Sequence, residues 1–406
     1  MNAKIGNRPK NIRSQNKKLI VDLFRTRGPQ TVSDISAIVK LSRTTVMKIN
    51  DELLAEQIII EAGKGASTDE GGKKPTIYCL KAQSSLIVTF YIHYRAIHFT
   101  LFDLQVQALV KAKLPVVTDE PLPSIIAKMR ELFMENTRNL PSDHRLLACI
   151  VAIHSNMDSE KGICLHATYF PSWGTNIPIR DEIVSALGIG CPVHVENFIR
   201  IKAFAEMKMG LAKGHSSALI IDAGWHGITA GLLIDEKLYQ GKHSLSGEIG
   251  HMILHPFDTV QCGCGGYGCF ESLISFQRLL DDAERALEQH PQSSLANHRG
   301  NISLQLFFEA AEAGDVLARL LMDNVINWFA RGFSNLITIF DPEMIIVEGD
   351  YAAAGQYFQT EVCRRSKHLT LLRLVRETPI IFSYSESNSS VVLSGAAAIA
   401  IDKYFN

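Results

Sequence analysis

The stretch Cys262-Gly263-Cys264-Gly265-Gly266-Tyr267-Gly268-Cys269 gathers three of the chain's eight cysteines, and His251 lies eleven residues before it. Three thiolates and an imidazole form a complete tetrahedral set of zinc ligands with no open position, which is typical of a structural site. The glycines between the ligands let the backbone pass close to an ion. We therefore predict one structural Zn²⁺ bound by His251, Cys262, Cys264 and Cys269.

Two alternatives stay open on the sequence alone. His255 competes with His251 as the fourth ligand on spacing, and three reduced cysteines in a glycine turn would show the same pattern.

The N-terminus is polar and basic, and no apolar run approaches the roughly 20 residues that a membrane span needs. We therefore expect a cytoplasmic protein with no membrane insertion, in which a local cysteine cluster indicates metal rather than disulfides.

The sequence around this cluster predicts a large α/β body. The chain has 406 residues, of which 46% are hydrophobic, enough for two or three domains with buried cores. Strands are predicted at 85–91, 96–104, 106–114, 148–153, 193–196, 218–222, 229–233, 344–347 and 379–382. Helices are predicted between them at 122–137, 177–187, 200–209, 276–288, 315–338 and 391–404. This mixed order of strands and helices indicates a body of two lobes.

The first eighty residues have a different pattern, typical of a helix-turn-helix with a wing. Apolar residues at helical spacing predict helices at 12–27, 32–40 and 43–56, the last of them capped by Ser42. Two short strands at 58–60 and 76–78 flank a glycine-rich loop. The alternative interpretation is an ordinary three-helix core with a solvated hairpin.

The charge of this segment indicates a DNA partner. Residues 1–50 contain eleven Lys and Arg against two acidic residues, a net charge of +9, whereas the whole chain carries −1. Such asymmetry indicates that one end of the chain binds a polyanion. We expect the exposed start of the third helix to enter the major groove and the loop to contact a minor groove or a phosphate. The predicted DNA-binding residues are Arg43, Thr44, Thr45 and Lys48 on the helix, and Lys73 and Lys74 on the loop.

These motifs resemble the ROK family (repressors, open reading frame proteins and sugar kinases) over essentially the whole chain. Gly247-Glu248-Ile249-Gly250-His251, followed by the cysteine stretch and Phe270-Glu271, is similar to the family's zinc and sugar signature. Residues 41–49 resemble the recognition helix of its glucose- and N-acetylglucosamine-responsive repressors, and Gly72-Lys73-Lys74-Pro75 stands where they carry a basic wing.

The resemblance implies an actin-like, hexokinase-like pair of lobes behind the winged helix-turn-helix, assembled as a homodimer or homotetramer. We accordingly expect a DNA-binding domain at 1–82 and a first lobe at 83–196, which is joined by the C-terminal helix at 385–406. The second lobe, with the zinc loop, is expected at 197–384.

The chain departs from the family's kinase members at three places, so we expect no catalytic residues. Kinases carry Asn-Asp after the strand predicted at 193–196, and that Asp is the general base on the sugar hydroxyl. This chain has Asn197-Phe198, and a phenyl ring accepts no proton. The phosphate-binding Asp-x-Gly-Gly-Thr of kinases is replaced by Tyr91-Ile92-His93-Tyr94-Arg95. The second glycine loop, residues 224–229, contains Trp225 and His226.

The resemblance also implies a sugar site. Asn197, Glu248, His251 and Glu271 match family positions that hold sugar hydroxyls, and carboxylates and amides suit a polyol. Phe198 removes one acceptor, and His154-Ser155-Asn156 stands where relatives carry Pro-Gly. Glu248 and Glu271 have an alternative role in supporting the zinc loop.

These observations predict a DNA-binding transcriptional regulator, a repressor of genes for sugar uptake or metabolism. Its expected partners are a double-stranded DNA operator and a sugar or sugar-phosphate effector bound by the non-catalytic body. Two alternatives are kept: a repressor controlled by a protein, such as a sugar-transport component, and an active sugar kinase with a spare basic domain.

Overall fold

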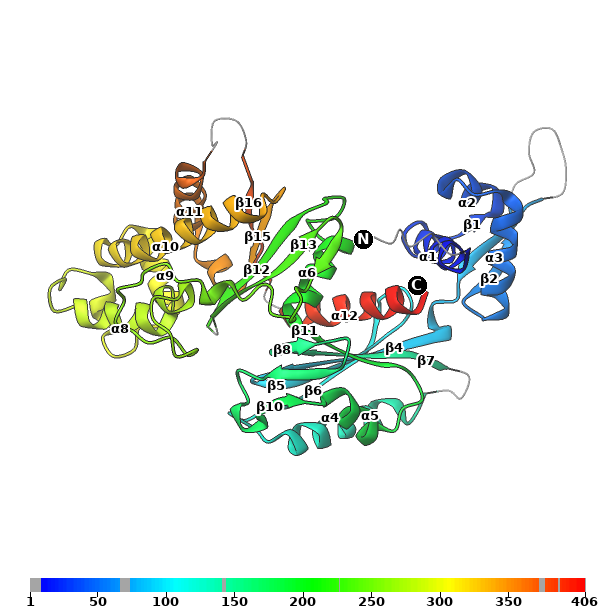
Figure 1. Cartoon of the computed structure of the whole chain (residues 1–406), viewed down its shortest axis with the longest axis horizontal. Coiled ribbons are helices and arrows are strands. Elements are labelled where there is room, and N and C mark those ends of the chain that lie inside the picture. Colours follow the sequence, from blue (N-terminus) through cyan, green and yellow to red (C-terminus); the bar gives the residue numbers. More distant parts are fainter. Residues whose placement is uncertain are drawn as a thin grey trace. The chain divides into compact units, whose positions relative to one another are not determined.

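The computed structural model describes residues 9–65, 74–140, 144–225, 227–371, 377–385 and 388–405. The chain divides into two compact units, Met1–Ile201 with Ser389–Asn406 and Lys202–Asn388 (Figure 1). The first unit contains the N-terminal domain and the first lobe, and the second contains the cysteine cluster. No helix in the described ranges combines the length and the apolar content that crossing a membrane requires.

The N-terminal domain is a winged helix-turn-helix. Its helices are α1 (Pro9–Arg27), α2 (Val32–Val39) and α3 (Arg43–Ala55). Its sheet has the order β1-β3-β2, formed by β1 (Gln30–Thr31), β2 (Ile59–Lys64) and β3 (Thr76–Leu80). The sequence did not predict β1, because a two-residue strand has no periodicity and exists only through its antiparallel pairing with β3.

The sheet of the first lobe has the strand order β11-β7-β4-β5-β6. Its members are β4 (Ser85–His93), β5 (Ala96–Phe102), β6 (Ala108–Pro115), β7 (Arg145–Ile153) and β11 (Val193–Asn197). The central strand β4 is buried from Ser85 to Ile92, so both of its faces are covered. The helices α4 (Leu122–Thr137) and α5 (Ile179–Leu187) pack into this core. A small sheet beside it has the order β10-β9-β8, from β8 (Asn156–Asp158), β9 (Ile163–His166) and β10 (Thr175–Ile177).

The sheet of the second unit repeats this topology in the order β14-β13-β12-β15-β16. Its strands are β12 (Ala218–Gly224), β13 (Gly227–Ile234), β14 (Lys237–Tyr239), β15 (Ile345–Glu348) and β16 (Ile380–Phe382). Its helices are α7 (Phe270–Leu273), α8 (Phe276–Ala286), α9 (Leu304–Ala313), α10 (Val316–Phe340) and α11 (Gln356–Leu369). In each sheet three consecutive antiparallel strands are followed by two parallel ones. The expected pair of α/β lobes behind a winged helix-turn-helix is therefore confirmed.

Two helices connect these parts of the chain. Helix α6 (Phe198–Met209) leads from the first unit into the second and begins two residues earlier than expected, because the side-chain oxygen of Asn197 accepts the Ile199 N–H at 2.9 Å. Helix α12 (Asn388–Phe405) belongs to the first unit from Ser389 onward. Its last turn contacts α1, where Ser14 Oγ donates to the Phe405 carbonyl at 2.6 Å and Lys18 pairs with Asp402.

A buried ion-pair cluster holds α6 on the second sheet. Lys202 is 1% exposed and pairs with Asp222 on β12 and with Glu348 on β15, 2.6 Å from its Oε2. Burial by itself lowers the pKa of Lys202, but the two carboxylates outweigh it and raise the pKa above its ordinary value. The lysine is therefore charged, and both carboxylates depend on it.

Replacing this lysine should destabilise the protein strongly. Lys202→Ala leaves two carboxylates in a dry site without their cation, and breaking a buried pair in this way typically costs about 3–5 kcal/mol of unfolding free energy. Urea unfolding of the variant measures the loss, with Lys213→Ala, at an exposed lysine just beyond the same helix, as the matched control. Equal stabilities of the two variants would contradict the assignment.

Candidate DNA-binding helix and metal centre

The turn between α2 and α3 is fixed by side-chain caps. Thr31 and Asp34 form a capping box at the start of α2, and Lys40, in the left-handed conformation at φ 54°, ends that helix. Ser42 then caps α3 by accepting the Thr45 N–H at 3.1 Å. The resulting orientation buries Val46, Ile49 and Leu53 and turns the opposite face of α3 outward.

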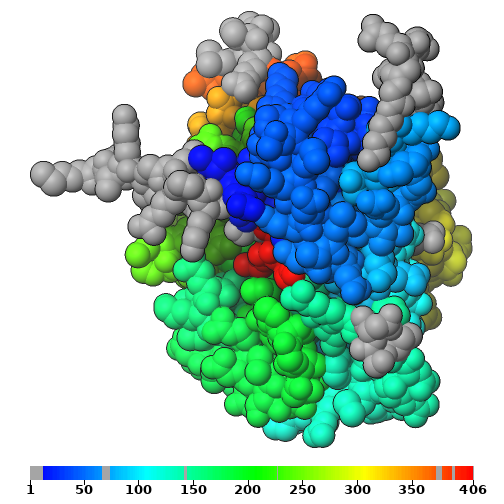
Figure 2. Space-filling view, turned by 90° about the vertical axis from the view of Figure 1, so that its right-hand side faces the viewer, coloured from blue at the N-terminus to red at the C-terminus, as the bar shows by residue number. Residues whose placement is uncertain are grey.

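The outward face of α3 carries the residues expected to contact DNA, with one difference. Arg43, Thr44 and Lys48 are exposed, and in the described part of the chain their side chains form no hydrogen bond or ion pair. Thr45 is half-buried, and its hydroxyl lies 2.8 Å from Ser42 Oγ at the helix start. Met47, which also belongs to the exposed start of this helix, is 54% exposed on the same face. Figure 2 shows the surface of this domain in blue.

The wing is a two-stranded hairpin. Strands β2 and β3 pair from Ile59–Leu80 to Lys64–Thr76, and the Lys64 ammonium donates to the Thr76 hydroxyl at 2.6 Å. Lys74, two residues before β3, is exposed. Lys73 lies outside the described residues.

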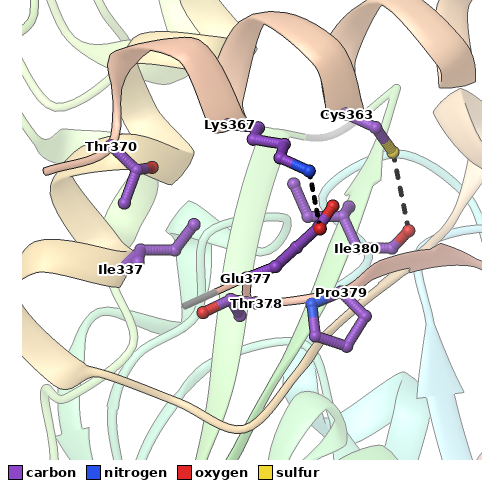
Figure 3. A pocket seen from close by; sticks show the side chains of 8 residues that line it. All are labelled: Ile337, Cys363, Lys367, Thr370, Glu377, Thr378, Pro379 and Ile380. Carbon is purple, nitrogen blue, oxygen red and sulfur yellow. Dashed lines mark hydrogen bonds and ion pairs between the residues drawn. The ribbon is translucent and has the colours of Figure 1, made fainter. Parts of the chain in front are cut away.

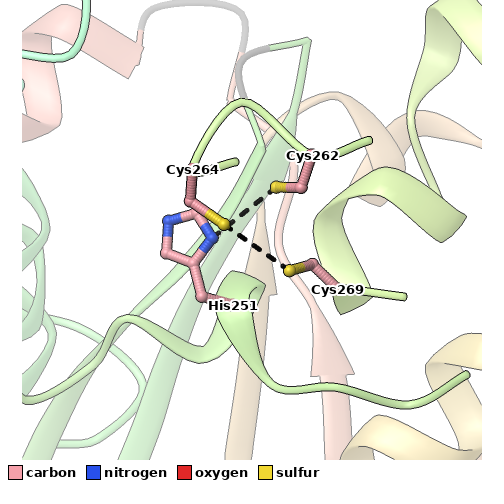
Figure 4. Close-up of side chains that lie close together, drawn as sticks. All are labelled: His251, Cys262, Cys264 and Cys269. Carbon is pink, nitrogen blue, oxygen red and sulfur yellow. Dashed lines mark hydrogen bonds between the residues drawn. The ribbon is translucent and has the colours of Figure 1, made fainter. Parts of the chain in front are cut away.

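The cysteine cluster has the geometry of a tetrahedral metal site (Figure 4). The ligand atoms of His251, Cys262, Cys264 and Cys269 lie within 4.8 Å of one another. The Cys264 and Cys269 sulfurs are 3.7 Å apart, and His251 Nδ1 is 3.7 Å from Cys262 Sγ. A tetrahedral zinc ion with Zn–S bonds of about 2.3 Å would hold two sulfurs roughly 3.8 Å apart, so the side chains fit the ion.

The local structure explains why His251, rather than His255, is the fourth member of the cluster with Cys262, Cys264 and Cys269. His251 ends a short 3-10 turn, Ile249–His251, whereas the His255 ring stacks on Trp328 with centroids 5.4 Å apart. Gly268 has φ +71°, and a Cβ there would lie 1.9 Å from the His255 carbonyl oxygen. Only glycine fits this position, so it allows the chain to return Cys269 to the cluster.

The electrostatics of the cluster favour a cation. Burial and the neighbouring thiols together raise the pKa of the Cys269 thiol to about 12. The Gly266 N–H lowers the pKa of Cys264. A divalent ion at the centre would replace the thiol protons and remove the repulsion between three thiolates.

The four residues expected to hold sugar hydroxyls lie in different settings. Asn197 belongs to the first unit and is 6% exposed; its amide donates to the Ser155 carbonyl at 2.9 Å while its oxygen caps α6. Glu248, His251 and Glu271 belong to the second unit. Glu271 lies beside the cysteine cluster, with Oε1 3.9 Å from Cys262 Sγ, and burial raises its pKa. Its position agrees with the supporting role considered above.

An aromatic cluster occupies the carboxyl ends of the parallel strands β4, β7 and β11, the edge where open α/β sheets bind ligands. The Phe198 ring stacks on His154 with centroids 3.5 Å apart and 18° between the planes. A hydrogen bond joins the Tyr91 hydroxyl to His154 Nε2. Phe198 is 5% exposed, and its phenyl ring brings no hydrogen-bonding group to this edge.

A pocket of about 260 Å³ lies elsewhere, between the ends of α10 and α11 and strand β16 (Figure 3). Lys367 and Glu377 form an ion pair of 2.6 Å in it, and Cys363 Sγ lies 3.6 Å from the Ile380 carbonyl oxygen. Its volume is below the roughly 300–1,000 Å³ of ligand pockets, and none of its lining residues was expected to bind anything.

Comparison with known proteins agrees with this arrangement. Residues 94–403 match the ROK family. The xylose repressor of Caldicellulosiruptor bescii is 25% identical over 346 residues, 84% of this chain and 85% of that protein. A crystal structure of a ROK family transcriptional regulator, a homolog of the E. coli MLC protein, superposes with a TM-score of 0.81 and 22% identity over 97% of this chain and 98% of its own.

A ROK family glucokinase from Streptomyces griseus, solved with glucose and AMPPNP, superposes with a TM-score of 0.63 and 23% identity. This likeness covers 77% of our chain and 98% of the glucokinase, whereas the regulator covers nearly the whole chain. The family match itself begins at residue 94, beyond the winged helix-turn-helix. The chain belongs to the ROK family.

Proposed function

We propose that this protein is a DNA-binding transcriptional repressor of genes for sugar uptake or metabolism, acting in the cytoplasm as a homodimer or homotetramer. The observation that carries the proposal is the start of α3, where Arg43, Thr44 and Lys48 are exposed and not engaged by the described residues. Long donors at the N-terminal end of a recognition helix can reach base edges, and Lys73 and Lys74 on the wing supply phosphate contacts. The likeness to a xylose repressor and to a transcriptional regulator over most of the chain supports it.

The body would then act as a sensor without catalysis. Transfer of a phosphoryl group requires a base on the attacking hydroxyl and a cradle for the nucleotide. Phe198 provides no base, and the stacked His154 and hydrogen-bonded Tyr91 add aromatic bulk at the same edge. A sugar bound by the body would shift DNA binding only by its different affinity for the two states of the protein. Glu248, His251 and Glu271 of the second unit are its candidate contacts. Contacts of α1 with α12 provide one path from the body to the DNA-binding domain.

A protein effector is the second candidate, because Asn197 uses both polar ends of its amide within the fold. Free sugars and cell extract, tested separately for release of bound DNA, distinguish the two modes of control. Release by a sugar supports the first, and release by extract alone supports the second.

The predicted DNA-binding residues should fall into two groups, those that contact base edges and those that contact phosphates. An operator is selected from random DNA with the full chain, and it should contain two related half-sites if the protein is a dimer. Arg43→Ala should relax base preference and cost about 1–3 kcal/mol of binding free energy. Lys74→Ala should weaken binding to all sequences and reduce the salt slope by about one. Lys111→Ala, at an exposed lysine of β6, is the control. Unchanged affinity in both DNA-domain variants would refute this docking.

Zinc should be present at about one ion per chain, with His251, Cys262, Cys264 and Cys269 as ligands. Cys264 is an exposed member of the cluster, so Cys264→Ser changes one ligand with little effect on packing. The variant should lose the metal and melt at a lower temperature, because structural zinc binding contributes directly to folding free energy. Metal analysis and thermal unfolding measure both effects, with Cys363→Ser as the control. Full metal content in Cys264→Ser would show that Cys264 is not a ligand.

We also expect no transfer of phosphate from ATP to common hexoses or amino sugars. Phe198→Asp restores the missing carboxylate but not the phosphate-binding glycines, which are replaced here by residues 91–95. Neither form should release ADP in a coupled assay with a sugar present. Turnover in Phe198→Asp would mean that a nucleotide site survives in the body.

A further inference from the structure

Met47 is a large apolar side chain on the outward face of α3. The other apolar residues of that stretch, Val46 and Ile49, are 0% and 2% exposed, whereas Met47 is 54% exposed. The side chains around it on this face are polar: Arg43 and Thr44 stand one turn earlier, and Lys48 follows directly. The fold of the domain alone therefore does not account for a thioether at this position.

The chemistry of the side chain limits what it can recognise. Methionine carries no hydrogen-bond donor, and its sulfur is a weak acceptor, so it distinguishes bases only by apolar contact. In the major groove the base edges present hydrogen-bonding groups and one apolar group, the C5-methyl of thymine. A flexible, unbranched side chain that lies between Arg43 and Lys48 on the exposed face of α3 is suited to reach it.

We propose that Met47 is a specificity-determining residue that contacts the C5-methyl group of a thymine in the operator. The proposal rests on the DNA-binding function proposed above. Met47 follows Arg43 by four residues, which is about 6 Å along the helix axis. Base pairs are stacked about 3.4 Å apart, so the thymine lies within about two base pairs of the base that Arg43 reads.

The test removes the methyl group alone. In the operator selected with the full chain, each thymine of one half-site is replaced in turn by deoxyuridine, and the affinity of the wild-type protein is measured. One position should lose about fourfold, the effect of one methyl group no longer removed from water. The same replacement should have no effect on Met47→Ala. A control variant, Leu19→Ala, changes a side chain that is 51% exposed on α1 and should retain the fourfold loss.

The outcomes separate the two claims. If no DNA is selected, the proposed function fails and this inference fails with it. If an operator is found but no thymine is sensitive to loss of its methyl group, or if Met47→Ala keeps the same sensitivity, Met47 does not read thymine although the protein binds DNA. A position that loses sensitivity only in Met47→Ala supports the contact.

Discussion

Lys202 brings a positive charge into the interior of the second unit, and the placement of α6 depends on it. The lysine pairs with carboxylates on two neighbouring parallel strands, β12 and β15. On the other side of the unit boundary, the buried Arg200 pairs with Glu196 at 3.1 Å. Such pairs impose a defined geometry, because a displaced partner leaves a charge without compensation in a dry site.

The DNA-binding domain divides its polar residues between two tasks. Thr31, Asp34 and Ser42 satisfy backbone N–H groups at the starts of α2 and α3. The exposed residues of α3 contribute nothing to those caps and are available to a ligand. Thr45 was predicted to contact a base, but its hydroxyl lies beside Ser42 Oγ at the helix cap.

The first lobe carries a group of rings where its parallel strands end. The carboxyl ends of β4, β7 and β11 lie at one edge of the sheet, and aromatic and imidazole rings occupy them. Buried rings that stack and share hydrogen bonds stabilise the sheet edge they cover. The cysteine loop of the second unit depends on separate constraints, the glycine at 268 and the close approach of His251 to three cysteines.

Features that depend on a few neighbouring residues could be predicted from the sequence. Helical periodicity and the Ser42 cap predicted α3, and the number and spacing of His and Cys residues predicted the cluster of four candidate metal ligands. Which residues of distant segments lie in contact became clear only from the folded chain. Spacing alone left both His251 and His255 as the fourth candidate ligand, and only the structure shows that the His255 ring stacks on Trp328. Spacing also could not reveal that Asn197 caps α6 or that β1 exists. These outcomes depend on contacts between segments far apart in the chain, and the free energy of such contacts leaves no periodic signal in either segment.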